Sequence, residues 1–298
     1  MLVYALGGGR GHAVRGSVLA AALRRCGAEA RVLVPSSAVE VPALLGVPCV
    51  PCPRPRDAAA LRRFVLDTCE RHAVHVLLVD TFPEGLLGEL CLGPAGPPRV
   101  GLLRCRRDAA SESFLRGVRQ LRLALDLEPH LGWLPRAVAA EALGPVTRPL
   151  APTPSPVDVL VVASEPALVP TLRRLSLRLG EQGMRVALAA EGRLVAPGVD
   201  RPAFPLPPSF LGAKVVVGAA GFNLTYEAHT QGAWHVALPR ARSHDDQRRR
   251  AAALGRTVDG PLALERLVAR LVTGAGRAPR LVDVLPAEVV ARRVLAVV

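Results

Sequence analysis

Short apolar runs, each followed by a glycine-rich or polar turn, recur along the whole chain. In the first half they cover residues 2–6, 30–34, 75–79 and 121–127. In the second half they cover residues 157–163, 184–190, 215–217 and 234–238. Continuous apolar runs of this length are typical of strands buried in a parallel sheet. We therefore expect an α/β protein, with the run 121–127 as the last strand of its first half.

The N-terminal pattern predicts strand, glycine turn and helix, a Rossmann-like opening. Val14, Val18, Ala22 and Cys26 recur every fourth residue after His12, which indicates one buried helix face. The dinucleotide fingerprint G-x-G-x-x-G fails, because His12 or Val14 stands where the third glycine would be. The second run also ends without an acidic residue for a ribose. A nicotinamide-dependent enzyme is therefore disfavoured.

A proline-dense stretch, PVTRPLAPTPSP at residues 145–156, predicts a semi-rigid linker. The 298 residues suffice for two ordinary domains with a core each. We expect domains at 1–144 and 157–282. A helix predicted within 283–298 crosses back to pack on the first domain.

The net charge of +13 comes almost wholly from arginine, since Lys214 is the only lysine. Aromatic residues are too sparse for a base-stacking surface, so no nucleic-acid partner is expected. The charge leaves open a weak contact with an anionic membrane surface or a pyrophosphate-bearing substrate. No apolar run approaches the length of a membrane span, and the N-terminus lacks a secretory signal. We expect a cytoplasmic protein, with peripheral binding at the inner membrane face left open.

The six cysteines show no metal pattern. Cys49 and Cys52 form the only C-x-x-C, and no second pair follows at zinc-site spacing. No D-x-D pair is evident either. We expect buried or incidental thiols, no bound metal and no cofactor.

The segment from Lys214 to Gln247 carries the clearest chemistry. The turn Gly218-Ala-Ala-Gly221 lets backbone N–H groups approach an anion, and the helix that begins near Phe222 points its positive end at the same place. Asn223 and Glu227 share one face of this helix, where a carboxylate can accept hydrogen bonds from sugar hydroxyls. The pattern predicts a phosphate seat, with the loop that ends at residues 244–247 beside it.

This segment resembles the C-terminal half of the MurG-like glycosyltransferases (glycosyltransferase family 28 and its relatives), in which an S/G-G-x-x-T-x-x-E helix precedes a strand and an H-x-D-x-Q turn. The resemblance implies a turn glycine, a helix threonine, a ribose-binding glutamate, and a turn whose acidic residue and glutamine face the donor sugar. The matching residues here are Gly221, Thr225, Glu227, His244, Asp246 and Gln247. The alternative is that Gly221 is only a turn, Glu227 is solvated, and Asp245 and Asp246 are helix-start charges after a Ser243 cap.

A second motif, G-G-x-x-G-H-x-x-R, stands at the N-terminus. Its residues are Gly8, Gly9, Gly11, His12 and Arg15. It is similar to the N-terminal motif of MurG-like enzymes, and closer to their G-H-x-x-R relatives, because MurG has a proline near the place of Arg15. At a helix N-terminus the dipole would keep His12 neutral, which suits a general base. The alternative makes His12 a cap and Arg15 a solvated charge.

Three further residues belong to the predicted site. Asp80 ends the run 75–79 and opens D-x-F-P-x-G, similar to predicted glycosyltransferases of this group; it either positions the acceptor or caps the turn. Ser164 is expected to cap a helix, in the place of the family's G-G-S-x-G turn. The neighbouring Glu165 would bring a negative charge towards phosphate. Phe204 stands where the family holds the base.

The resemblance implies a GT-B fold, with two Rossmann-like domains facing each other across a cleft. It also implies a hexosyltransferase that moves a hexose or N-acetylhexosamine from a UDP-sugar to an unknown acceptor hydroxyl with inversion. His12 would be the base, and the glycine turns would stabilise the departing diphosphate. Two alternatives stay open: a nucleotide-sugar hydrolase of the same fold, and a non-catalytic nucleotide-sugar-binding protein.

Overall fold

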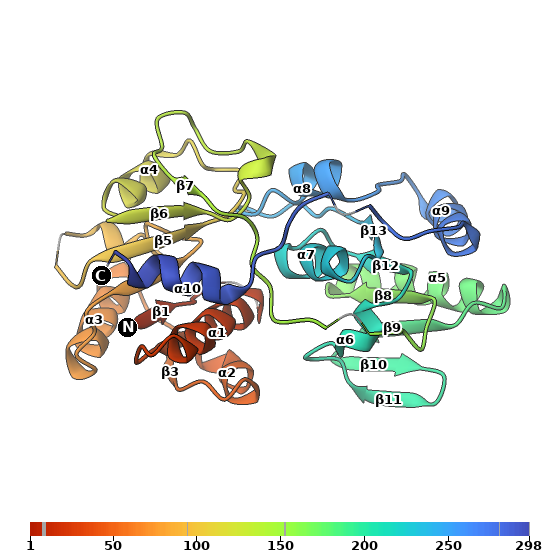
Figure 1. Ribbon diagram of the computed structural model, residues 1–298, viewed down its shortest axis with the longest axis horizontal. Helices are drawn as coiled ribbons and strands as arrows, with labels where there is room; N and C mark the ends of the chain where they lie inside the picture. Colours follow the sequence, from red (N-terminus) through yellow and green to blue (C-terminus); the bar gives the residue numbers. More distant parts are fainter. Residues whose placement is uncertain (8–9, 94, 152, 280, 298) are drawn as a thin grey trace. The chain divides into compact units, whose positions relative to one another are not determined.

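The computed structural model describes residues 1–7, 10–93, 95–151, 153–279 and 281–297 (Figure 1). Two compact units divide the chain. The first contains residues 1–149 and the C-terminal segment from Val284, and the second contains residues 150–283. Each unit is a helix-covered sheet, so the predicted α/β class is confirmed. Gly8 and Gly9 of the N-terminal motif lie outside the described residues.

The described strands of the first unit form one seven-stranded parallel sheet, in the order β3-β2-β1-β4-β5-β6-β7. They are β1 Leu2–Tyr4, β2 Arg31–Pro35, β3 Cys49–Cys52, β4 Leu77–Asp80, β5 Arg99–Leu103, β6 Leu123–Asp126 and β7 Glu141–Ala142. The central strands β1 and β4 are buried on both faces, which explains why they read as continuous apolar runs.

Helices cover both faces of this sheet. They are α1 Arg10–Arg25, α2 Glu40–Leu44, α3 Ala58–Arg71, α4 Glu112–Arg119 and α10 Ala287–Leu295. Gly16 lets α1 approach closely, since a Cβ there would lie 2.5 Å from that of Ala5 in the chain leaving β1. The C-terminal helix α10 lies along α1 (Figure 1), and Arg25 bonds Glu288 at 2.6 Å. Arg293 of α10 also bonds Glu141 of β7 at 2.7 Å.

The second unit holds a six-stranded sheet in the order β11-β10-β9-β8-β12-β13 among the described residues. Its strands are β8 Val159–Ala163, β9 Val186–Ala190, β10 Arg193–Ala196, β11 Val199–Pro202, β12 Val215–Gly218 and β13 Trp234–Ala237. Its helices are α5 Val169–Glu181, α6 Pro208–Leu211, α7 Phe222–Thr230, α8 Gln247–Leu254 and α9 Pro261–Thr273. Apolar residues of α5 and α9 pack on one face of the sheet, and those of α6 and α7 on the other.

Some expectations were wrong. The run 121–127 is not the last strand of its unit, because the two-residue β7, too short to give an apolar run, adds beyond β6. Ser164 does not cap a helix: a short 3-10 turn begins at Pro166, and α5 begins at Val169 with no side-chain cap among the described residues. Pro166 has no N–H for such a cap to bind.

Each sheet has a switch point, which is a place where the connections from two adjacent strands run towards opposite edges of the sheet. In the first sheet it lies between β1 and β4, and in the second between β8 and β12. Ligands of doubly wound sheets bind beyond the carboxyl ends of the strands at such points. The chain leaves β1 towards His12 and β4 at Asp80, and it leaves β8 towards Glu165 and β12 at Gly218.

Candidate functional site

A histidine and a carboxylate meet at the switch point of the first sheet. Nδ1 of His12, in the first turn of α1, lies 2.8 Å from Oδ2 of Asp80, the last residue of β4. The two side chains are buried, with residue exposures of 7% and 0%. The His12 ring also stacks on Phe82, with centroids 5.3 Å apart. The structure thus brings together the two residues that the sequence singled out for catalysis.

Gly7 makes room for the His12 ring. A Cβ at Gly7 would overlap the imidazole atoms, so any larger residue there displaces the ring. The glycine turn therefore contributes by close packing at this position, and the pair depends on it.

Arg15 holds the other side of the carboxylate. Its Nε donates to Oδ1 of Asp80 and its Nη2 to Oδ2, both at 2.7 Å, which is a bidentate, charge-assisted pair. Arg15 is 3% exposed, so it is not a solvated charge. These hydrogen bonds make Arg15 a support for Asp80. Gly11 is exposed in the first turn of α1.

Thr81 and Arg104 complete the group, and the sequence reasoning missed both. Thr81 has a φ of +74°, a conformation that β-branched residues rarely adopt. Its hydroxyl oxygen accepts from Arg104 Nε at 2.9 Å and Arg15 Nη2 at 3.1 Å. Arg104 Nη2 lies 3.3 Å from Nε2 of His12. Because Arg104 follows β5, only the adjacency of β4 and β5 reveals this contact.

The electrostatics fix the protonation of the pair. Burial acts to raise the pKa of Asp80, but Arg15 and the bond from His12 outweigh it and hold that pKa well below its ordinary value. Burial lowers the pKa of His12 from 6.5 to about 4, against the opposing influence of Asp80. Asp80 is therefore ionised and can only accept, so Nδ1 of the neutral His12 carries the proton and Nε2 keeps its lone pair. Burial dominates this shift, whereas the sequence argument relied on the helix dipole.

The loop after Asp80 is rigidly supported. Arg106, 2% exposed, bonds Glu84 at 2.7 Å, donates to the Thr81 carbonyl at 3.2 Å, and lies 5.0 Å from the Phe82 ring centre. Farther along, the Glu89 carboxylate accepts from the Tyr4 hydroxyl at 2.5 Å and from Leu87 N at 2.9 Å. The D-x-F-P-x-G run and its glutamate thus fix the backbone that presents Asp80 and Thr81.

The predicted phosphate seat lies at the switch point of the second sheet. A Cβ at Gly218 would come within 2.8 Å of Leu224 and 3.1 Å of the Val162 carbonyl, so packing requires this glycine. At Gly221, the N-cap of α7, a Cβ would meet no described atom within 4 Å beyond its chain neighbours. A side chain at Gly221 would therefore point into open space, which leaves room for an anion beside the start of α7.

Further along α7, Asn223 is half-buried and Glu227 is 6% exposed. The alternative of a solvated Glu227 is therefore wrong. Thr225 is fully buried, and its hydroxyl finds no hydrogen-bond partner among the described residues. Ser164 and His244 are exposed, and Phe204 lies half-exposed between β11 and α6.

The loop before α8 is tied to the glycine turn. Asp246, not Ser243, caps α8 by accepting from Arg249 N at 3.1 Å. Gln247, 4% exposed, accepts from Arg240 N at 3.0 Å and donates to Asp245 at 3.2 Å. The side-chain amide of Gln247 therefore joins the two ends of the loop that precedes α8.

Arg250 connects this loop to the glycine turn, and the sequence analysis did not identify it. It is fully buried, and it donates to the Ala220 carbonyl at 2.8 Å and to Asp245 Oδ1 at 3.0 Å. The turn after β12 and the loop after β13 thus form one surface, as the sequence predicted.

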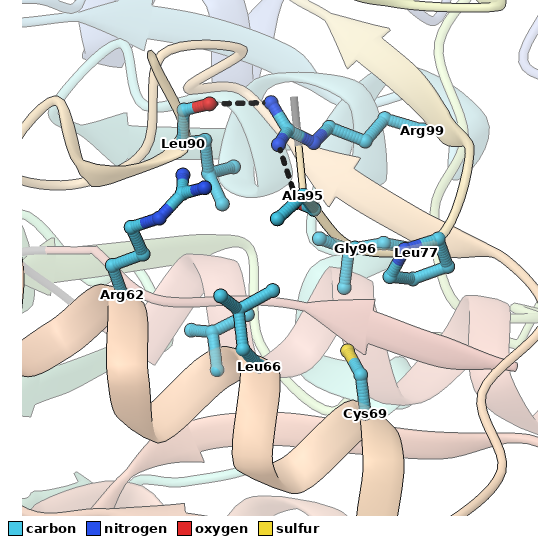
Figure 2. A pocket seen from close by; sticks show the side chains of 10 residues that line it. Arg62, Leu66, Cys69, Leu77, Leu90, Ala95, Gly96 and Arg99 are labelled. Atoms are coloured by element: carbon cyan, nitrogen blue, oxygen red, sulfur yellow. Dashed lines mark hydrogen bonds between the residues drawn. The ribbon is translucent and has the colours of Figure 1, made fainter. Parts of the chain in front are cut away.

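Neither of the two pockets described is lined by His12 or Asp80. One is a narrow pocket between α3 and the segment before β5, where the Arg99 guanidinium donates to the carbonyls of Leu90 and Ala95 (Figure 2). It lies at the amino ends of β4 and β5, away from His12, and the guanidinium of Arg99 is engaged by backbone carbonyls. The other, about 570 Å³, lies in the second unit beside Arg240 and the starts of α5 and α9.

The described residues hold neither a candidate membrane span nor a candidate metal site. None of their helices combines the length and the apolar character needed to cross a membrane. Within the same part of the chain, histidine, cysteine and acidic side chains do not gather into a group that could hold a metal ion. The six cysteines are free thiols there.

No protein-family model matches the sequence, and no curated protein matches it significantly. Solved structures match across nearly the whole chain. Spinosyn rhamnosyltransferase SpnG, complexed with thymidine diphosphate, has a TM-score of 0.69 at 16% identity, covering 99% of both chains. Spinosyn forosaminyltransferase SpnP has a TM-score of 0.66 at 15% identity, covering 99% of this chain and 94% of its own. Glycosyltransferase SsfS6 from Streptomyces sp. SF2575 has a TM-score of 0.63 at 19% identity, covering 99% of both.

These likenesses establish the fold, which is the GT-B fold that the sequence predicted. SsfS6 has also been complexed with thymidine diphosphate, and SpnG with spinosyn aglycone.

Proposed function

We propose that this chain is a glycosyltransferase that moves a sugar from a nucleotide sugar to an acceptor hydroxyl. The observation that carries the proposal is the buried His12–Asp80 pair at the carboxyl ends of β1 and β4. It occupies the ligand-binding end of a sheet in a chain that has the fold of solved glycosyltransferases. A neutral imidazole oriented by an ionised carboxylate is the arrangement that a general base needs.

The reaction that fits this pair is a single displacement with inversion. Nε2 of His12 takes the proton of the acceptor hydroxyl, whose oxygen forms the new bond to the anomeric carbon. The bond from that carbon to the diphosphate breaks, and the nucleoside diphosphate departs. Asp80 stabilises the imidazolium that forms. Arg104 has to leave Nε2 first, and its departure removes one of the charges that lower the pKa of His12. Acceptor binding thereby strengthens the base.

The second unit is the proposed donor site. The open first turn of α7 at Gly221 would receive the diphosphate, and Glu227 would accept from the ribose hydroxyls. We extend the proposal to a hexose or N-acetylhexosamine on UDP and to the MurG-like subgroup, on the strength of the Gly221–Glu227 motif. Thymidine diphosphate is the second nucleotide to test, because SpnG and SsfS6 bind it.

The test is turnover on UDP- and TDP-sugars, with hydroxylated acceptors and with water, for the wild type and His12→Asn. The amide of Asn keeps a donor near Nδ1 but supplies no base. We expect turnover to fall by about 10²–10⁴-fold, with donor affinity nearly unchanged. Transfer that continues at the wild-type rate in His12→Asn contradicts the proposal. Free sugar formed in water without any transfer identifies a hydrolase instead.

One observation favours a second candidate, a non-catalytic nucleotide-sugar-binding protein. Arg104 Nη2 stands against the lone pair that a base would use. If Arg104 keeps this position, the wild type will bind donor tightly and turn over neither acceptor nor water. Arg104→Met separates the two cases, because turnover that appears only in this variant identifies the resting protein as blocked.

A further inference from the structure

One carboxylate in the second unit is held by two arginines. Glu165 Oε2 lies 3.1 Å from Arg240 Nε, and Oε1 lies 2.6 Å from Arg242 Nη2. The Glu165 side chain is 16% exposed, while those of Arg240 and Arg242 are 39% and 51% exposed. The group therefore carries two positive charges and one negative charge at the surface.

Strand register places this group over the end of β12. β12 lies between β8 and β13, with Gly218 opposite Val162 on one side and Ala237 on the other. Glu165 lies just beyond the end of β8, and Arg240 and Arg242 just beyond the end of β13. The ion pairs thus cross the carboxyl end of β12, where the turn to Gly221 begins. This is the ligand-binding switch point of the sheet.

We propose that Arg240 and Arg242 bind the diphosphate of a nucleotide ligand, and that Glu165 is the carboxylate that this diphosphate replaces. The ligand's identity rests on the proposed function. Phosphate and carboxylate oxygens compete for the same guanidinium N–H groups, and a diphosphate offers enough oxygens and charge for both arginines.

The structure allows the exchange. Hydrogen bonding to Gln247 fixes the Arg240 backbone, whereas the Arg240 side chain is 39% exposed and the residue borders the pocket of about 570 Å³. Pairs as exposed as these stabilise a fold only weakly, so a ligand of higher charge can displace them. Glu165 thus competes with the phosphate groups for Arg240 and Arg242, and without a ligand it pairs with both.

A purely structural role predicts the opposite sign. If Glu165 only fastens the 239–247 loop to the end of β8, its removal loosens the seat and weakens nucleotide binding. If it competes with the ligand, its removal tightens binding. Glu165→Gln, which keeps the shape and loses the charge, decides between them.

The experiment is titration calorimetry of UDP and TDP, with uridine measured by displacement, on the full chain. We expect Glu165→Gln to bind the diphosphates about tenfold more tightly, and Arg240→Met or Arg242→Met about tenfold more weakly, with uridine unchanged throughout. Glu191→Gln is the control, because it removes the charge of another carboxylate that pairs with an arginine of the same unit, Arg173 at 2.9 Å. We expect no change in this control.

Unchanged or weaker diphosphate binding by a folded Glu165→Gln overturns the proposal. So does an arginine variant that loses uridine and UDP affinity equally. Should Glu165→Gln fail to fold, the arginine variants decide alone, since a loss confined to diphosphates supports the proposal. A wild type that binds neither UDP nor TDP overturns the proposed function as well, whereas sugar transfer with normal diphosphate affinity in all three variants overturns only this inference.

Discussion

The buried imidazole of His12 makes the stability of the protein depend on pH in a way that a substitution can isolate. Burial lowers its pKa from 6.5 to about 4. The unfolded chain therefore takes up a proton near pH 6.5, and the folded chain only near pH 4. Between these values the unfolded state binds more protons, so stability falls as the pH falls. The loss amounts to about 3 kcal/mol when complete and to about 2 kcal/mol between pH 7 and pH 5.

His12→Asn removes this titration, so its free energy of unfolding should fall by about 2 kcal/mol less than that of the wild type over the same pH interval. Urea denaturation at pH 7 and pH 5, followed by circular dichroism, measures both. The other buried histidines contribute equally to the pH dependence of both proteins, so their contribution cancels in the comparison. They include His235, whose burial lowers its pKa to about 3. Equal pH slopes for wild type and His12→Asn would refute a histidine held neutral by burial, and with it the assignment of the proton to Nδ1.

Three other substitutions test the supports of the site. Asp80→Asn leaves the buried Arg15 without its anion, so it should lower the free energy of unfolding, measured by thermal melting, by about 3–5 kcal/mol. Asp158→Asn, at the exposed pair with Arg185, should lower it by under about 1 kcal/mol. Gly7→Ala should displace the His12 ring and reduce turnover about as much as His12→Asn, while Gly180→Ala, with no described atom near its Cβ, should not; equal turnover in both would contradict the packing argument. Arg250→Met should weaken nucleotide binding and lower the melting temperature, because it cuts the 239–247 loop from Ala220; unchanged calorimetric affinity would detach that loop from the site.

The strands that the sequence predicted are those whose burial is visible as a long apolar run. β1, β4, β8 and β12 are buried on both faces, so their runs were visible. β7, β10 and β11 were missed, since none has a long apolar run, and so was the fully buried β5, whose apolar run is interrupted by Gly101. β3 contains Pro51, which only an edge strand tolerates, and its place at the sheet edge explains how it escaped detection.

The site was predictable where a motif is local and unpredictable where it depends on packing. Asp80 directly follows one recognisable run and His12 follows another after a glycine turn, but their contact depends on the adjacency of β1 and β4. Thr81, Arg104 and Arg250 carry no local signal, because arginine is abundant here and only tertiary contacts select these residues. Burial also changed the physical reason for one expectation, since desolvation is the largest cause of the lowered pKa that keeps His12 neutral, whereas the sequence argument had relied on the helix dipole.

Enclosure of the His12 ring also restricts the route by which a proton leaves. The ring is bounded by Gly7, Phe82 and Asp80, and its Nε2 faces the place that Arg104 and an acceptor would share. During the proposed reaction, a proton taken up at Nε2 therefore stays until the glycosylated product departs and water reaches the ring. Regeneration of the base is then coupled to product release, so a slower turnover in heavy water would contain a contribution from that exit as well as one from the proton transfer of the displacement itself.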